Sequence, residues 1–144
     1  MYTPRKLEWD DALTTGDMEI DAQHRYLIDV FNDLGKTIEE DQHDKEDIER
    51  VLSVMNFYAG WHFGREEDCF AQYNCPAAEK NIKAHAVFIE KLNTYRNEFE
   101  QTSDPKEMAL KLHEELSDWI VNHILAVDGQ LYPCIHNRPK PSNS

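Results

Sequence analysis

Apolar residues recur every three or four positions in four separate stretches of the chain, which is the spacing of one face of an α-helix. The strict alternation of apolar and polar residues that marks a β-strand is absent. The spacing predicts four amphipathic helices, and their apolar stripes cover residues 20–38, 48–70, 81–99 and 112–127.

Residues that begin helices lie between these stretches. Asp21 is predicted to cap the first helix, and Pro76 is expected at the first position of the third helix. Before the fourth helix, Asp104, Pro105 and Glu107 supply an N-cap, a proline at the first helical position and a carboxylate at the third. Short connections favour antiparallel neighbours, so the prediction is an all-α, antiparallel up-down-up-down four-helix bundle.

The two ends of the chain lack this periodicity. Residues 1–18 are predicted to form an N-terminal arm with a turn at Gly16, and residues 133–144 are predicted to form a flexible tail. Residues 19–132 would then form the four-helix domain. The length of 144 residues suits a single domain with one core.

Each apolar stripe is interrupted by side chains of the kinds that bind metal ions: His24 in the first, His62 and Glu66 in the second, Asn81 and His85 in the third, and His123 with the following Asp128 in the fourth. In an antiparallel bundle, the starts of the first and third helices lie beside the ends of the second and fourth. These side chains would therefore share one layer of the core. A buried layer without partners would cost several kcal/mol, whereas a shared cation would satisfy it.

A single histidine on an apolar face is more often a hydrogen-bonded core residue, but four histidines at one level favour a metal site. Imidazole suits iron, zinc or copper, and a carboxylate can bridge two metal ions. His62 and Glu66 are four residues apart, so they lie on one helical face. His123 and Asp128 are five residues apart, a turn of about 140°. They can reach one centre only if the helix bends or if Asp128 reaches across from a neighbouring turn.

The other candidate ligands are expected to take no part in this layer. His43, His113 and His136 are predicted to be solvated, in a loop, at a helix start and in the tail. The three cysteines, Cys69, Cys75 and Cys134, are odd in number and form no CxxC pair, so they are expected to be reduced thiols. Cys69 and Cys75 lie near the predicted layer, but the imidazoles and carboxylates already fill it, so a thiolate ligand is not expected.

The chain is strongly acidic, with a formal charge of −13 and a pI near 4.8. This charge argues against nucleic acid and anionic membranes as partners, and it also serves solubility. No run of about 18 apolar residues suggests a membrane span. The N-terminus has no apolar signal region, so a cytoplasmic location is expected.

Several segments together resemble the hemerythrin family, specifically the bacterial hemerythrins. The resemblance runs from about Leu7 to Leu131. It rests on Trp9, Thr15-Gly-Asp-Met-Glu-Ile-Asp-Ala-Gln-His24, His62-Phe-Gly-Arg-Glu66-Glu67, Tyr73-Asn-Cys-Pro76, His85-Ala-Val-Phe88, and Trp119-Ile-Val-Asn-His123 followed by Asp128. The resemblance implies a four-helix bundle that holds two non-haem iron ions with an oxo or hydroxo bridge and binds O2 reversibly.

The resemblance also implies a role for each matching residue, in three pairs: His24 and His62 would hold the O2-binding iron, Glu66 and Asp128 would bridge the two irons, and His85 and His123 would hold the second iron. Trp119 and Ile120 match bulky residues that wall the O2 pocket. The family places a further histidine four residues before the one that matches His85, and this chain has Asn81 there. The second iron site is therefore expected to be atypical.

The expected function is O2 binding for carriage, storage or sensing by a protein that is not an enzyme. No protein partner is identified. The alternative is a di-iron enzyme that reacts with peroxide, NO or ferrous iron at the opened second site. A third possibility is a metal-poor structural or signalling bundle.

Overall fold

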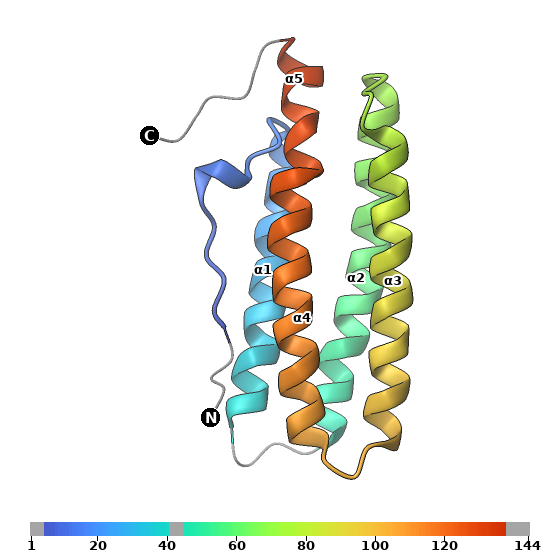
Figure 1. Cartoon of the computed structure of the whole chain (residues 1–144). Coiled ribbons are helices and arrows are strands. Elements are labelled where there is room, and N and C mark those ends of the chain that lie inside the picture. The colour runs from blue at the N-terminus through green and yellow to red at the C-terminus, as the bar shows by residue number, and fades with distance from the viewer. Residues whose placement is uncertain (1–4, 41–44, 138–144) are drawn as a thin grey trace.

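A computed structural model describes residues 5–40 and 45–137. Four long helices, α1 (Met18–Glu39), α2 (Lys45–Gln72), α3 (Ala78–Gln101) and α4 (Pro105–Ala126), run alternately in opposite directions (Figure 1). Each packs against the two helices beside it. The predicted all-α, antiparallel four-helix bundle is confirmed, and the starts of α1 and α3 share one end of the bundle with the ends of α2 and α4.

Three shorter helical elements flank the bundle: the 3₁₀ turns η1 (Asp11–Leu13) and η2 (Asp128–Gln130), and the helix α5 (Leu131–His136). Residues 14–17 connect η1 to α1, and Val127 connects α4 to η2. None of the described helices combines the length and the apolar character that crossing a bilayer would require.

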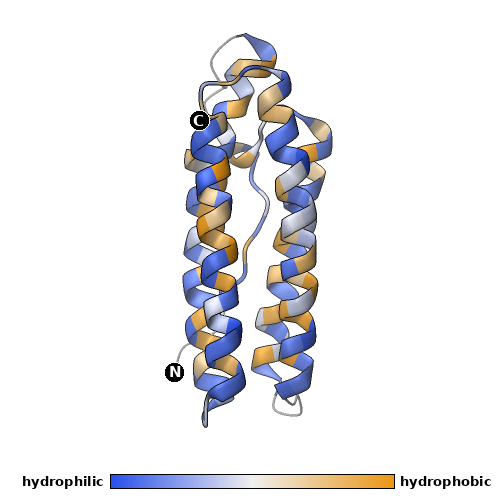
Figure 2. Cartoon of the chain, turned by 90° about the vertical axis from the view of Figure 1, so that its right-hand side faces the viewer, coloured by the Kyte–Doolittle hydropathy of each residue, from blue (hydrophilic) through white to orange (hydrophobic). Residues whose placement is uncertain are grey.

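Each long helix contains both hydrophobic and hydrophilic residues, because only one face of the helix packs in the core (Figure 2). Every long helix contributes fully buried side chains to the main core, among them Phe31, Leu52, Leu92 and Leu112. A smaller apolar cluster lies at the end of the bundle where α1 begins, and it consists of Ile20, Cys69, Phe70, Cys75, Ala77 and Leu131. A layer of polar side chains separates the two clusters.

The N-terminal arm runs along the bundle beside α1 and α4. The backbone N–H of Leu7 donates to Oδ1 of Asn32, and Nδ2 of Asn32 donates to the carbonyl of Leu7, both at 2.8 Å. Leu7 and Leu13 are buried in the main core. The arm therefore contributes to the core of the domain.

Helix α1 begins differently from the prediction. Its N-cap is Asp17, whose side chain accepts a hydrogen bond from the N–H of Ile20, and Asp21 lies inside the first turn. The Asp21 carboxylate instead accepts hydrogen bonds from the side chain of Thr14 and from both the N–H and the side chain of Thr15. The turn predicted at Gly16 is present, with a φ of +86° that suits glycine.

The other two predicted starts had different outcomes. Asp104 accepts a hydrogen bond from the N–H of Glu107, and Pro105 is the first residue of α4, as predicted. Helix α3, however, begins at Ala78 without a side-chain cap. Pro76 lies in the preceding turn, where the N–H of Cys75 donates to the carbonyl of Phe70.

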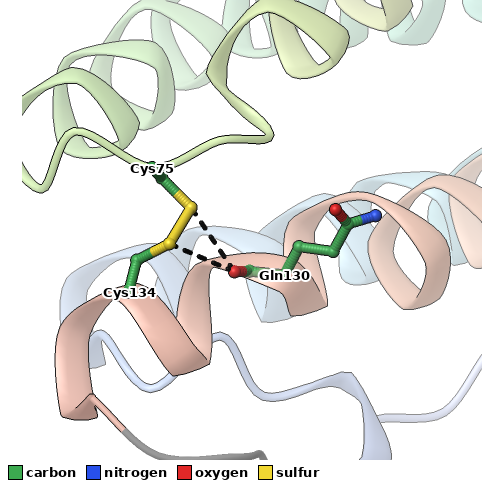
Figure 3. Close-up of a disulfide and its surroundings, with 3 residues drawn as sticks. All are labelled: Cys75, Gln130 and Cys134. Atoms are coloured by element: carbon green, nitrogen blue, oxygen red, sulfur yellow. Dashed lines mark hydrogen bonds between the residues drawn. A yellow bond between two sulfur atoms is a disulfide. The ribbon is translucent and has the colours of Figure 1, made fainter.

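The prediction that all three cysteines are reduced thiols is wrong for two of them. Cys75 and Cys134 form a disulfide, with their Cα atoms 5.6 Å apart (Figure 3). The prediction failed because the pair is separated by 59 residues and meets only when α5 folds back against the turn between α2 and α3. Cys69 is a free, buried thiol. Burial, with a smaller contribution from Asp17, raises the pKa of Cys69 to about 11, so the thiol stays protonated at neutral pH.

His113 was expected in solvent and is instead fully buried. Its ring stacks on Phe31, with the ring centroids 4.0 Å apart. His113 lies in the third turn of α4 rather than at a helix start, on the same side of the helix as the buried Leu116 and Ser117, three and four residues later. His136 is exposed, as predicted, and its Nε2 lies 3.2 Å from the carbonyl oxygen of Gly16. His43 lies outside the described residues.

Helical structure continues beyond the expected end of the domain. Helix α5 reaches His136, whereas residues from 133 onward were predicted to be a flexible tail. Leu131 and Tyr132 are buried and hold the start of α5 against the bundle. Residues 138–144 lie outside the described part of the chain, and the domain boundaries as a whole stay a prediction.

Candidate metal centre

The predicted metal-ligand side chains meet in the polar layer between the two apolar clusters. His24 comes from α1, His62 and Glu66 from α2, His85 from α3, His123 from α4 and Asp128 from η2. All six are buried, and Glu66 and Asp128 are at most 1% exposed. One helical turn to either side of this layer, the chain is apolar. The structure thus collects the whole predicted set in one buried site.

Asp128 reaches the layer because α4 ends before it. The last residue of α4 is Ala126, and the 3₁₀ turn η2 begins at Asp128. The N–H of Val127 still donates to the carbonyl of His123 at 2.8 Å. Oδ1 of Asp128 then lies 2.8 Å from Nε2 of His123. The change of helix type resolves the five-residue spacing that a regular helix would place on two different faces.

Glu66 lies between two pairs of histidines, and each of its oxygens faces one pair. Oε2 is 2.8 Å from Nε2 of His24 and 3.1 Å from Nε2 of His62. Oε1 is 3.0 Å from Nε2 of His85 and 3.8 Å from Nε2 of His123. Each oxygen of the Glu66 carboxylate thus faces a different pair of imidazole nitrogens.

Asp128 spans the same two sides. Its Oδ1 faces His123, and its Oδ2 is 3.2 Å from Nε2 of His24. Donor atoms therefore form two overlapping groups, each within 4.8 Å, that share Glu66: one of His24, His62 and Glu66, and one of Glu66, His85, His123 and Asp128. Either group has the size and donor types of a metal site.

Two supporting side chains orient the histidines, and the sequence assigned a role to neither. Nδ1 of His62 donates to Oε1 of Gln23 at 2.6 Å, and Nδ1 of His85 donates to Oε2 of Glu67 at 2.8 Å. Each bond puts the proton on Nδ1 and directs Nε2 toward Glu66. Such partners fix the ring and the tautomer of a histidine ligand. Their only signal in the sequence is adjacency, since Gln23 precedes His24 and Glu67 follows Glu66.

In the absence of a cation, protonated histidines balance the negative charge of the buried carboxylates. Burial lowers the pKa of His24, but the contacts with Asp128 and Glu66 outweigh it and raise this pKa to about 10. The same balance raises the pKa of His123 to about 9. Burial would raise the pKa of Glu66, but the four surrounding histidines bring it well below its usual range. The carboxylate is therefore ionised, and a cation would displace protons from histidines.

Some buried atoms of the layer make no hydrogen bond of good geometry, although two of them lie within 3.2 Å of an oppositely charged group. They are Oδ2 of Asp128, Nε2 of His123, Nδ1 of His24 and Oδ1 of Asn81. Unpaired polar atoms at such depth are costly, and a cation between the carboxylates and the imidazoles would satisfy the first two. Nitrogen and oxygen donors of this kind suit iron and zinc. The residues present thus fit a metal site.

Asn81 occupies the position four residues before His85 and is fully buried. Its Nδ2 donates to Oε1 of Glu66 at 2.7 Å and to Oδ1 of Asp128 at 3.0 Å, and it lies 3.3 Å from Nε2 of His85. The amide therefore directs a donor, not an oxygen, toward both carboxylates. In this arrangement Asn81 links the carboxylates of Glu66 and Asp128 through one shared donor.

Aromatic side chains cover the outer faces of two of the histidines. Phe63 stacks on His85 with ring centroids 3.8 Å apart, and Trp119 stacks on His123 with centroids 4.4 Å apart. Ile120 is buried beside Trp119 in the main core. These apolar groups cover the layer on the side of the main core.

Comparison with known proteins is consistent with this geometry. The family model described as "Hemerythrin HHE cation binding domain" matches residues 15–135. A protein named Bacteriohemerythrin from Stenotrophomonas maltophilia is 30% identical over 126 residues, which cover 88% of this chain and 78% of that protein. Another of that name from Clostridium acetobutylicum is 28% identical, covering 85% and 95%. A Hemerythrin-like protein from Naegleria gruberi is 25% identical, covering 87% and 90%.

Proposed function

Because the chain belongs to the hemerythrin family, we propose that it is a non-haem di-iron protein that binds O2 or a related small ligand and is not an enzyme. The observation that supports this most strongly is the position of Glu66 between two histidine pairs. A structural core has no need of a carboxylate surrounded by four imidazoles, whereas a pair of cations requires such a bridge.

The proposed ligands follow from the two overlapping groups. His24 and His62 would hold one iron, and His85 and His123 the other. Glu66 and Asp128 would bind both, since each directs one oxygen to each side. Two iron ions bound in this way would supply the electrons and the open position that reversible O2 binding needs.

The second site is proposed to be atypical because Asn81 replaces a nitrogen donor with an amide. Each side of the centre then offers two imidazole nitrogens and two carboxylate oxygens from this set. With Nδ2 directed at the carboxylates, Asn81 acts as a hydrogen-bond donor that orients Glu66 and Asp128. The two halves would thus be more alike than in a site with a third histidine.

The surrounding residues suit an apolar diatomic ligand. Phe63 and Trp119 pack on the histidine rings and exclude water on the core side, and the smaller cluster with Phe70 and Leu131 closes the other side. A dry site also limits the access of protons to bound ligand. His62 and His85 keep their protons on Nδ1 through Gln23 and Glu67, which leaves Nε2 free to bind a cation.

The test is to load the protein with ferrous iron without oxygen, measure iron per chain, and then record its absorbance on exposure to O2. An O2-dependent change that reverses when O2 is removed supports the proposal. A rapid, irreversible conversion, with turnover of peroxide, NO or ferrous iron, would favour the enzyme instead. Failure to retain iron would contradict both.

A further inference from the structure

The disulfide between Cys75 and Cys134 links the two segments that complete the polar layer. Cys75 lies in the turn between α2 and α3, nine residues after Glu66 and six before Asn81. Cys134 lies in α5, six residues after Asp128. The disulfide therefore joins the segment that follows Asp128 to the turn that lies between Glu66 and Asn81 (Figure 3).

Asp128 depends on this region more than the other candidate ligands do. The histidines and Glu66 lie within long helices, whereas Asp128 begins a 3₁₀ turn of three residues. That turn is followed only by the six-residue helix α5. Short helices have little stability of their own, so the position of Asp128 relies on tertiary contacts. These are the burial of Leu131 and Tyr132 and the covalent link at Cys134.

The surroundings of the pair suit the reduced state as well as the oxidised one. The carbonyl oxygen of Gln130 lies 3.5 Å from Sγ of Cys75 and 3.6 Å from Sγ of Cys134 (Figure 3). In the disulfide neither sulfur carries a hydrogen, so both distances are contacts only. After reduction, either thiol could donate its S–H to this carbonyl. Because the Gln130 carbonyl is already beside both sulfurs, at least one of the two thiols formed by reduction would have a hydrogen-bond acceptor.

The two sulfurs also differ in accessibility. Cys75 is 4% exposed, whereas Cys134 is only half-buried, in the short helix α5 near the end of the described chain. A thiolate from solvent would therefore attack Sγ of Cys134. This forms a mixed disulfide and releases Cys75 as a thiolate that takes up a proton. A second thiol of the same reductant then attacks the mixed disulfide, which frees Cys134 as a thiol and leaves the reductant oxidised.

We propose that Cys75 and Cys134 form a thiol–disulfide exchange site whose substrate is a dithiol reductant, and that opening it loosens the turn that carries Asp128. In the oxidised state the turn is held against the α2–α3 connection, and Asp128 stays between His24 and His123. In the reduced state η2 and α5 separate from the bundle more often, and the layer loses one of its two bridging carboxylates for part of the time.

The consequence is that the redox state of the pair sets how firmly the site retains metal. This consequence rests on the proposed function, but the loosening of η2 and α5 does not. Reduced protein should lose bound iron to a chelator about tenfold faster than oxidised protein, which is the scale of effect when groups that orient metal ligands are removed.

The experiment compares the parent protein, the Cys75→Ser/Cys134→Ser double variant and the Cys69→Ser variant. Each is treated with a dithiol or left oxidised, the dithiol is removed under argon because dithiols bind iron, and free thiols are counted. Iron loss to a chelator is then followed. The parent should lose iron faster only after reduction, and the double variant should lose it fast in both conditions. Cys69→Ser should behave as the parent does, because Cys69 is not in the bond.

A second measurement uses metal-free protein and so does not depend on iron binding. Amide hydrogen exchange of residues 128–136 should be several-fold faster after reduction, while exchange in the middle of α1 stays unchanged. If iron binds but the exchange and the release rates are the same in both redox states, the inference is wrong and the proposed function stands. If no iron binds but exchange still accelerates, the proposed function fails and the loosening is supported. Three free thiols in untreated protein, or a bond that dithiols do not open in the folded state, would overturn the inference.

Discussion

The amide of Asn81, which lies four residues before His85, donates to Oε1 of Glu66 at 2.7 Å. The same nitrogen donates to Oδ1 of Asp128 at 3.0 Å. The amide of Asn81 therefore occupies the layer as a hydrogen-bond donor to both of the carboxylates that we propose as metal ligands.

Asn81→His should raise iron retention. An imidazole can supply a lone pair to the second iron, whereas the Asn81 nitrogen cannot. The measurement is iron per chain after dialysis against a chelator, together with the decay of the O2-dependent absorbance. Retention should rise and the decay should slow.

Asn81→Leu is the matched control, since it keeps a similar volume without a donor or an acceptor. It should retain less iron than the parent, because the two carboxylates lose their shared hydrogen-bond donor. If Asn81→His retains no more iron than the parent, the asparagine is a competent replacement for the histidine.

Glu66→Ala should abolish paired metal, because no other described carboxylate except Asp128 faces both histidine pairs. Metal content should fall from about two ions per chain to about one or none, as expected when a bridging carboxylate is lost. Glu67→Gln is the matched control on the next residue, and it removes only the charge opposite Nδ1 of His85. It should keep paired metal while its affinity falls by roughly 10–100-fold. Two ions retained in Glu66→Ala would refute the bridging role.

Removing the metal should destabilise the fold. A cation that binds only the folded state adds stability according to its concentration relative to Kd, about 2.7 kcal/mol at a hundredfold excess over Kd. For a domain of this size the midpoint of thermal unfolding should drop by roughly 5–10 °C in the metal-free protein. Calorimetry of the loaded and the metal-free forms measures the difference. Equal midpoints would mean that the polar layer holds no metal.

His113 should make the fold sensitive to acid. Burial lowers its pKa from 6.5 to about 4, and contact with the backbone of Phe31 offsets only part of this effect. Neither ring nitrogen makes a hydrogen bond of good geometry. The unfolded chain therefore takes up the proton first, so the stability contributed by neutral His113 is present above pH 6.5 and is lost as the pH falls toward 4. Between pH 7 and pH 5 the loss should be about 2 kcal/mol.

The comparison for this effect is metal-free parent against His113→Leu, by denaturant unfolding at several pH values. The other titrating groups are common to both proteins, so the difference between their free energies of unfolding isolates His113. As the pH falls from 7 to 5, the free energy of unfolding of the leucine variant should increase relative to that of the parent. A constant difference across this range would show that His113 does not titrate in the core.

The spacing of apolar residues was enough to predict the bundle and the level at which the candidate ligands meet. Helical periodicity is a local property, and an antiparallel arrangement with short connections leaves few ways to bury four stripes. His24, His62, Glu66, His85 and His123 all lie within those helices. Their positions along the helix axes therefore follow from the chain itself.

Tertiary structure alone decided two kinds of feature: irregular backbone at helix ends, and contacts between segments that are distant in the sequence. The 3₁₀ turn that brings Asp128 to His123 depends on packing at the end of α4, which periodicity does not describe. The bond between Cys75 and Cys134 joins residues 59 apart in the chain, so no local pattern marks it.

The surroundings of individual side chains were decided in the same way. The burial of His113 and the hydrogen bonds of Asn81 are set by neighbours from other helices. The sequence shows which residue types occur on one face of a helix, because residues three or four positions apart lie on the same face. It does not show which atoms they contact, because those contacts are formed only when the helices pack.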